Sequence, residues 1–102
     1  MKRKRLLMEN AVPVLSWRKT ACADLSAIVE YIADDNPDAA QELKDEIETR
    51  VSELARFPQM YKSGRVVGTR EMTVRSNFIV VYAEDTKTVS VLRVLHAAQQ
   101  WP

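Results

Sequence analysis

The sequence is poor in the residues that form covalent and metal cross-links. Its 102 residues include one cysteine, Cys22, and one histidine, His96. A lone cysteine excludes an internal disulfide and a thiolate metal cluster, and it is typical of a reducing, cytoplasmic location. We expect Cys22 to be a small buried apolar residue at a helix start, not a nucleophile. We expect neither a metal nor a cofactor, because His96 has no histidine partner and no spaced set of carboxylates accompanies it.

Long apolar runs are also missing. No window approaches the ~20 apolar residues of a membrane span, so we expect no membrane association. The first residues resemble the basic n-region of a signal peptide, but Leu6-Leu7-Met8 is too short to be the apolar region that follows it. We therefore expect residues 1–11 to form a basic, disordered, solvated tail, with phosphate contact and a start at Met8 as the alternatives.

The composition fits one soluble domain, which we place at residues 12–102, with 46% apolar and 28% charged residues. The net charge of +1 indicates no global attraction to nucleic acid. The charge is unevenly distributed, because residues 20–56 hold ten acidic and three basic residues, whereas residues 57–102 hold three acidic and six basic ones. We therefore expect an asymmetric distribution of charge, with an acidic first half of the domain and a basic second half.

Two helices are predicted after a short edge strand at residues 12–17. The first should begin at an N-cap Thr20, with Asp24 in its first turn, and run to about Asp35. Asn36 and Pro37 predict the start of the second helix, because they supply a capping side chain and a suitable φ angle. Its apolar seam is predicted to contain Ala40, Leu43, Ile47, Val51 and Leu54, and its outer face a Glu46–Arg50 pair.

Three strands should follow the loop at residues 59–68, at residues 69–75, 78–83 and 88–95. The last has apolar residues on both faces, with Val89, Val91 and Leu95 on one and Leu92 and Val94 on the other, which is typical of an interior strand. Arg93 interrupts it and should either line a groove or pair with a carboxylate. The sequence thus predicts an α+β fold in the order β-α-α-β-β-β, with a helical hairpin packed on a small, mainly antiparallel four-stranded sheet.

Several strings, in this order and spacing, resemble the RelE/ParE superfamily of toxins from bacterial toxin–antitoxin pairs. They are Asp24-Leu25 with Ile28, Tyr31-Ile32-Ala33, Asn36-Pro37 with Ala39-Ala40, Leu54 with Phe57-Pro58, Gly68-Thr69-Arg70-Glu71, Phe78-Ile79-Val80-Val81-Tyr82 and Val94-Leu95-His96. Together they cover about residues 12–102. The resemblance implies a toxin that a cognate antitoxin from an adjacent gene neutralises in a hetero-oligomeric complex.

The superfamily has two functional branches, and the resemblance is closer to the ParE branch. RelE-like members cut messenger RNA on the ribosome and typically carry an arginine in the third strand, where this chain has Ile79. ParE-like members poison DNA gyrase, and the ending from His96 to Pro102 resembles theirs. The resemblance thus implies a gyrase inhibitor, with a ribosome-dependent endoribonuclease or an inactive antitoxin-binding member as alternatives.

The residue chemistry agrees with this preference. RNA cleavage needs a base, an acid and cations on the phosphorane, and no dedicated acid–base pair is visible. In the alternative, catalytic reading, the active residues would be His96, Arg70, Arg93 and Arg65. For His96 a structural or tail-anchoring role, partner contact and catalysis all remain open, and Arg70 and Glu71 could pair with neighbouring or helical charges. Trp17 could be an anchor or a ligand platform, as could Trp101.

Two surfaces are predicted for binding. Contact with a target or partner is assigned to Arg65, Arg70, Arg75, Arg93, His96 and Trp101. An apolar groove for the antitoxin is assigned to Leu25, Ile28, Ile32, Leu43 and Ile47.

Overall fold

The computed structural model describes residues 13–102, so the predicted basic tail at residues 1–11 lies outside the described residues. The elements are β1 (Val14–Trp17), α2 (Lys19–Ala33), α3 (Pro37–Leu54), β2 (Arg70–Val74), β3 (Phe78–Glu84) and β4 (Thr88–His96). This α+β order is the predicted one. None of the helices in this part of the chain is long and apolar enough to cross a membrane.

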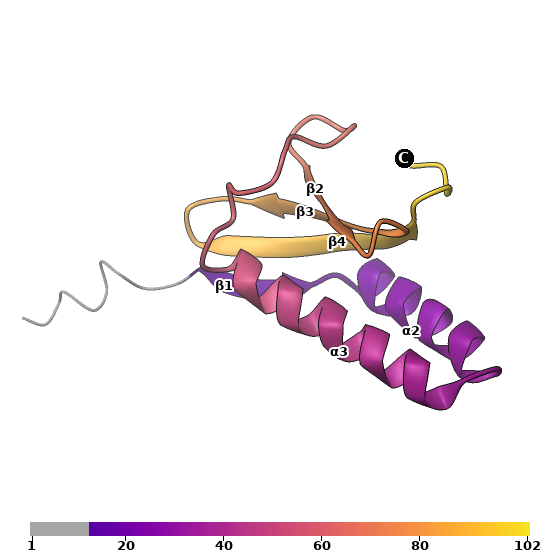
Figure 1. The fold of residues 1–102 in the computed structure, drawn as a ribbon. Helices are drawn as coiled ribbons and strands as arrows, with labels where there is room; N and C mark the ends of the chain where they lie inside the picture. The colour runs from indigo at the N-terminus through magenta and orange to yellow at the C-terminus, as the bar shows by residue number, and fades with distance from the viewer. Residues whose placement is uncertain (1–12) are drawn as a thin grey trace, which may run out of the picture.

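The four strands form one sheet in the order β1-β4-β3-β2. β1 pairs in parallel with β4, while the β3–β4 and β2–β3 pairs are antiparallel. The helical hairpin of α2 and α3 covers one face, and the α3–β2 connection rises from the end of α3 past the sheet to the other side, where the C-terminus also lies (Figure 1). The predicted helix-on-sheet arrangement is therefore confirmed, with β1 at an edge and β4 inside the sheet.

The core lies between the helical hairpin and the sheet. The predicted seam of α3 is buried, from Ala40 through to Leu54. The sheet contributes Met72, Val74, Val80, Tyr82, Val89, Val91 and Val94, all at most 1% exposed. At the start of α3, the Asn36 side chain accepts a hydrogen bond from the Ala39 N–H, and Pro37 occupies the first turn, as predicted.

The start of α2 differs from the prediction. The helix begins at Lys19 after Arg18, which provides no side-chain cap, and it ends at Ala33. Thr20 is not the cap, because its Oγ1 donates to the Leu92 carbonyl oxygen at 2.9 Å. Cys22 was expected to be buried but is exposed, since its side chain lies on the rim of an open pocket.

Thr20 bonds to Leu92 because one edge of β4 has no neighbouring strand there. β1 ends at Trp17, opposite Val91, so the rest of β4 has no neighbouring strand on that side. The first turns of α2 satisfy its backbone groups instead, through Thr20 and through Asp24 Oδ2, which accepts from the Val94 N–H at 2.9 Å. Buried backbone groups require such partners, so α2 completes the sheet edge.

A β-bulge in β4 changes which residues face the helices. Tyr82 pairs with Val91 but Val81 pairs with Arg93, so Leu92 is the extra residue. Val94 therefore joins the core that contains Val91, whereas Leu95 is buried outside that cluster. The predicted alternation through β4 is wrong beyond Leu92 because one inserted residue exchanges the two faces.

Candidate functional site

The four arginines that the sequence assigned to a functional surface are all held by carboxylates. Each has a different partner, and the pairs are Arg65–Glu71, Arg70–Glu84, Arg75–Glu46 and Arg93–Asp24. Their charges are therefore locally compensated. The Arg65 and Arg70 pairs meet at the start of β2, whereas the Arg75 and Arg93 pairs lie elsewhere in the fold.

The Arg93–Asp24 pair joins the β4 bulge to α2. Arg93 Nε donates to Asp24 Oδ2 at 2.6 Å and Nη2 donates to Oδ1 at 3.1 Å, a bidentate arrangement. The hydrogen bond with the Asp24 carboxylate raises the pKa of Arg93 above its ordinary value. On its other side the Arg93 guanidinium lies 5.7 Å from the centroid of the Trp101 ring. Of the two predicted possibilities for Arg93, the structure shows the carboxylate pair, with the Trp101 ring beside the same guanidinium.

Glu71 is a buried charge that fixes the α3–β2 connection. Its carboxylate accepts from the backbone N–H of Arg65 at 2.9 Å and from Arg65 Nε and Nη2 at 3.2 and 3.3 Å. Burial raises the pKa of Glu71, but the hydrogen bonds from Arg65 and the positive charges of Arg65 and Lys62 outweigh it, so the pKa lies below the ordinary 4.5. Glu71 and Arg65 are thus a structural pair, which leaves little of the Arg65 guanidinium for catalysis.

Arg70 and Arg75 are tied to other elements. Arg70 Nη1 donates to the Tyr61 carbonyl oxygen at 2.6 Å, and its Nε lies 3.4 Å from Glu84 Oε1. Arg75 Nε donates to Glu46 Oε1 at 2.6 Å, so Glu46 on α3 pairs across to the β2–β3 turn rather than with Arg50 as predicted.

His96 stands apart from Arg70. The register pairs Arg70 with Tyr82 and His96 with Phe78, at opposite ends and on opposite sides of β3. From strand rise and spacing, their Cα atoms are roughly 16 Å apart. The exposed His96 ring packs edge-on against Phe78 with centroids 5.8 Å apart, and its Nδ1 accepts the Ala98 N–H at 3.3 Å. The structure therefore does not bring the residues of the alternative catalytic reading together.

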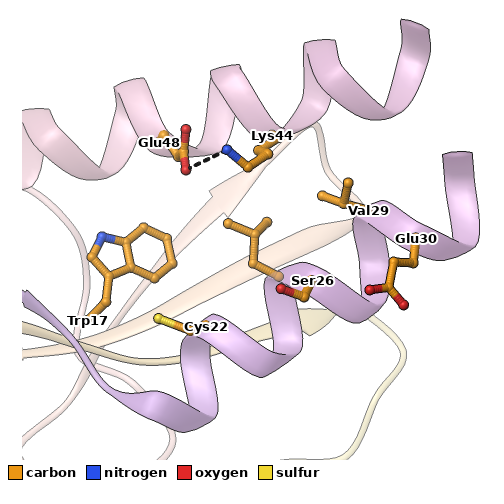
Figure 2. A pocket seen from close by; sticks show the side chains of 8 residues that line it. Trp17, Cys22, Ser26, Val29, Glu30, Lys44 and Glu48 are labelled. Atoms are coloured by element: carbon orange, nitrogen blue, oxygen red, sulfur yellow. Dashed lines mark ion pairs between the residues drawn. The ribbon is translucent and has the colours of Figure 1, made fainter. Parts of the chain in front are cut away.

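An open pocket of about 480 Å³ lies between α2, α3 and the end of β1 (Figure 2). Apolar side chains of Trp17, Leu25 and Val29 line it, and the Lys44–Glu48 ion pair, 3.1 Å long, lies on its α3 side. Cys22, Ser26 and Glu30 complete its lining. Such a concave apolar surface with charged edges suits a protein segment better than it suits chemistry.

A second apolar groove, of about 400 Å³, lies between α2 and the end of the sheet. It is lined by Ala27, Ile28, Tyr31, Ile32, Asn77, Phe78 and His96. Of the five residues predicted to form an antitoxin groove, Ile28 and Ile32 lie here and Leu25 lies in the first pocket. Leu43 and Ile47 are 1% and 0% exposed and belong to the core, because α3 turns them toward the sheet.

The described residues contain no cluster of metal-ligating side chains. Across residues 13–102 no three His, Cys, Asp or Glu side chains come together as metal ligands would. A feature that sequence reasoning missed is the group of exposed apolar residues Phe57, Met60 and Val67 in the α3–β2 connection. No periodicity marks them, because irregular loops lack the alternation that identifies a face.

Comparison with known proteins supports the family indicated by the sequence. The family model described as "ParE toxin of type II toxin-antitoxin system, parDE" matches residues 15–101. The Sinorhizobium fredii protein Y4kP, named as a candidate toxin, is 35% identical over 88 residues, which cover 86% of this chain and 92% of Y4kP. Toxin RelE2 of Caulobacter vibrioides is 34% identical over 88 residues, which cover 84% of this chain and 94% of RelE2.

Two solved structures share the fold. One is the chromosomal ParDE toxin–antitoxin system from P. aeruginosa, with a TM-score of 0.75, 24% identity and coverage of 83% of this chain and 96% of that one. The other is the RelBE2 complex from Mycobacterium tuberculosis, with a TM-score of 0.56, 24% identity and coverage of 84% and 99%. With a family match over almost all described residues, the chain belongs to the ParE toxins of type II toxin–antitoxin systems.

Proposed function

We propose that this ParE-family toxin acts by binding DNA gyrase and blocking replication, without breaking bonds itself. The observation that carries the proposal is the dispersal of the residues a nuclease would need. His96 and Arg70 lie at opposite ends of β3, and each candidate arginine is already paired with a carboxylate. A phosphorane would need converging cations beside an acid and a base.

Ile79 supports the same conclusion. It stands in β3 where nuclease members of the superfamily typically carry an arginine, and it pairs with Thr73 on one side and Leu95 on the other. An aliphatic side chain there can pack but cannot stabilise a negative charge. A toxin of this kind would act through its surface, in the cytoplasm where gyrase and the chromosome are found.

The neutralising partner in this proposal is a cognate antitoxin encoded by an adjacent gene. The two separate apolar grooves that flank α2 would accommodate an amphipathic helix and an extended segment of such a partner. Tyr31, which is 80% exposed, stands at the second groove and would be covered by such a partner.

The second candidate function is ribosome-dependent cleavage of messenger RNA. It is favoured by the 34% identity to Toxin RelE2, a protein named for the nuclease branch. In that case His96 would have to act with cations contributed by the ribosome, because its own groove holds no arginine or lysine among the residues that line it.

The two functions can be separated in cells. The toxin is induced with and without the product of the neighbouring gene, and DNA synthesis and translation are followed by pulse labelling. The proposal predicts that DNA synthesis stops first, that co-expression of the neighbour restores it, and that His96→Ala still arrests it. Arrest of translation before replication would overturn the gyrase assignment.

A further inference from the structure

The α3–β2 loop, residues 55–69, exposes three large apolar side chains to solvent. Phe57 is 57% exposed, Met60 is 61% exposed and Val67 is 99% exposed. These are three of the five large apolar side chains that are exposed in the described part of the chain, the others being Val14 and Tyr31. Such a concentration on one loop is typical of an interaction surface.

The loop is held rigidly despite its length. The buried Tyr82 hydroxyl donates to the Pro58 carbonyl oxygen at 2.6 Å, and Arg70 holds the Tyr61 carbonyl oxygen at the same distance. The Glu71 carboxylate holds Arg65, as described above. Several core-anchored side chains thus fix the loop before any partner arrives, which reduces the ordering cost of binding.

Gly64 shows how closely the loop packs on the sheet. Its N–H donates to the Thr69 carbonyl oxygen at 2.7 Å. A Cβ added at Gly64 would lie 2.4 Å from Thr69 Oγ1 and 3.2 Å from Glu71, so the chain can pass here only without a side chain. Phe57, Met60 and Val67 are therefore presented by a loop that is fixed to the sheet, and the backbone of this loop rises from the end of α3 past the sheet (Figure 1).

The loop is also positively charged. Residues 55–69 include Arg56, Lys62 and Arg65 and no acidic residue. Arg65 is paired with Glu71, but within residues 13–102 neither Arg56 nor Lys62 has a carboxylate partner within 4.0 Å. The Arg56 guanidinium lies 6.0 Å from the centroid of the Phe57 ring, so an exposed cation and an exposed aromatic ring form one unit.

We propose that this loop is the surface with which the toxin docks onto its protein target, on an acidic region that offers an apolar recess. Exposed Phe, Met and Arg side chains are the residue types enriched at protein interfaces. A nucleic acid fits less well as the partner. The apolar side chains of Phe57, Met60 and Val67 would face its phosphates. Among the described cations of this loop, only Arg56 and Lys62 have no carboxylate partner and could neutralise them. The inference rests on the proposed function and adds to it a contact surface distinct from the grooves that flank α2.

The test uses the full-length toxin with a matched pair of variants. The loop variant combines Met60→Ser, Val67→Ser and Lys62→Glu. The control variant combines Val14→Ser, which removes an exposed apolar side chain on β1 outside both grooves, with Lys87→Glu in the β3–β4 turn. Circular dichroism melting first verifies that both remain folded, as expected for exposed positions. Binding to purified gyrase, binding to the antitoxin and growth arrest are then measured.

We expect the loop variant to lose at least tenfold in gyrase affinity and to stop arresting growth, while it binds the antitoxin as well as the wild type. The control variant should bind gyrase normally. Wild-type affinity in the loop variant would overturn the docking surface, as would equal losses for gyrase and antitoxin. Loss of binding to DNA alone, with gyrase affinity unchanged, would show a nucleic-acid contact instead.

The same measurements separate this inference from the proposed function. If the wild-type toxin does not bind gyrase, the gyrase assignment fails. Growth arrest by the loop variant then shows whether the loop is needed for binding to a different target. A loop variant that still arrests growth under those conditions would refute the docking surface itself. A loop variant that no longer arrests growth but retains the antitoxin would support it.

Discussion

Removing the Asp24 carboxylate should destabilise the protein more than removing an exposed charge. Asp24 accepts two hydrogen bonds from the Arg93 guanidinium and one from the Val94 N–H. In Asp24→Ala these donors lose their acceptor. The Arg93 side chain, which is only 30% exposed, keeps its charge beside a newly opened space.

The expected size follows from burial. Truncating one member of a buried ion pair costs about 3–5 kcal/mol, whereas exposed pairs contribute about 0–1 kcal/mol. The side chains of Arg93 and Asp24 are 30% and 17% exposed, so we expect an intermediate loss. A loss of about 2–3 kcal/mol corresponds to a fall in Tm of roughly 10–20 °C for a domain of this size.

Urea and thermal unfolding followed by circular dichroism measure this loss. The control is Glu48→Gln, which breaks the Lys44–Glu48 pair, whose side chains are 41% and 48% exposed. We expect the control to change the free energy of unfolding by less than about 0.5 kcal/mol. An equally small change in Asp24→Ala would refute the view that this carboxylate joins α2 to the bulged strand.

Three further predictions concern the α3–β2 loop and its anchors. The lowered pKa of Glu71 means that its ionised form stabilises the fold above about pH 4.5 and that this contribution is lost as the pH falls through the folded-state pKa. Glu71→Gln should therefore lower the urea midpoint at pH 7 and flatten its decline in acid. Gly64→Ala should cost about 1–3 kcal/mol in urea unfolding, because the new Cβ would meet Thr69 Oγ1 at 2.4 Å. Tyr82→Phe should cost about 1 kcal/mol by removing the hydrogen bond to Pro58. Because burial raises the pKa of Tyr82 to about 12, the same variant should lose a tyrosine absorbance change near pH 12 in an alkaline titration.

Local signals predicted the regular elements well. Asn36 and Pro37 specify the start of α3 by their own chemistry, and the spacing of Leu43 and Ile47 specifies its buried face. These features depend on residues within one or two turns of each other. The parity of the strands up to Val91 was predictable for the same reason.

The contacts between distant elements were not predictable in this way. Asp24 and Arg93 are 69 residues apart, and their pairing depends on β1 ending before β4 does. The bulge at Leu92 exchanges the faces of β4 without leaving a pattern in the sequence. The sequence indicated that Arg93 needs a carboxylate or a groove, but only the fold identifies which one it has.

The gyrase assignment is tested most directly by a supercoiling assay in which purified gyrase is titrated with purified toxin. A parallel reaction contains the toxin and programmed ribosomes that carry messenger RNA. A toxin that binds gyrase should inhibit supercoiling at near-equimolar concentration, added antitoxin should reverse the inhibition, and the ribosome-bound messenger RNA should stay intact. Cleavage of that messenger RNA with no effect on supercoiling would contradict the gyrase assignment.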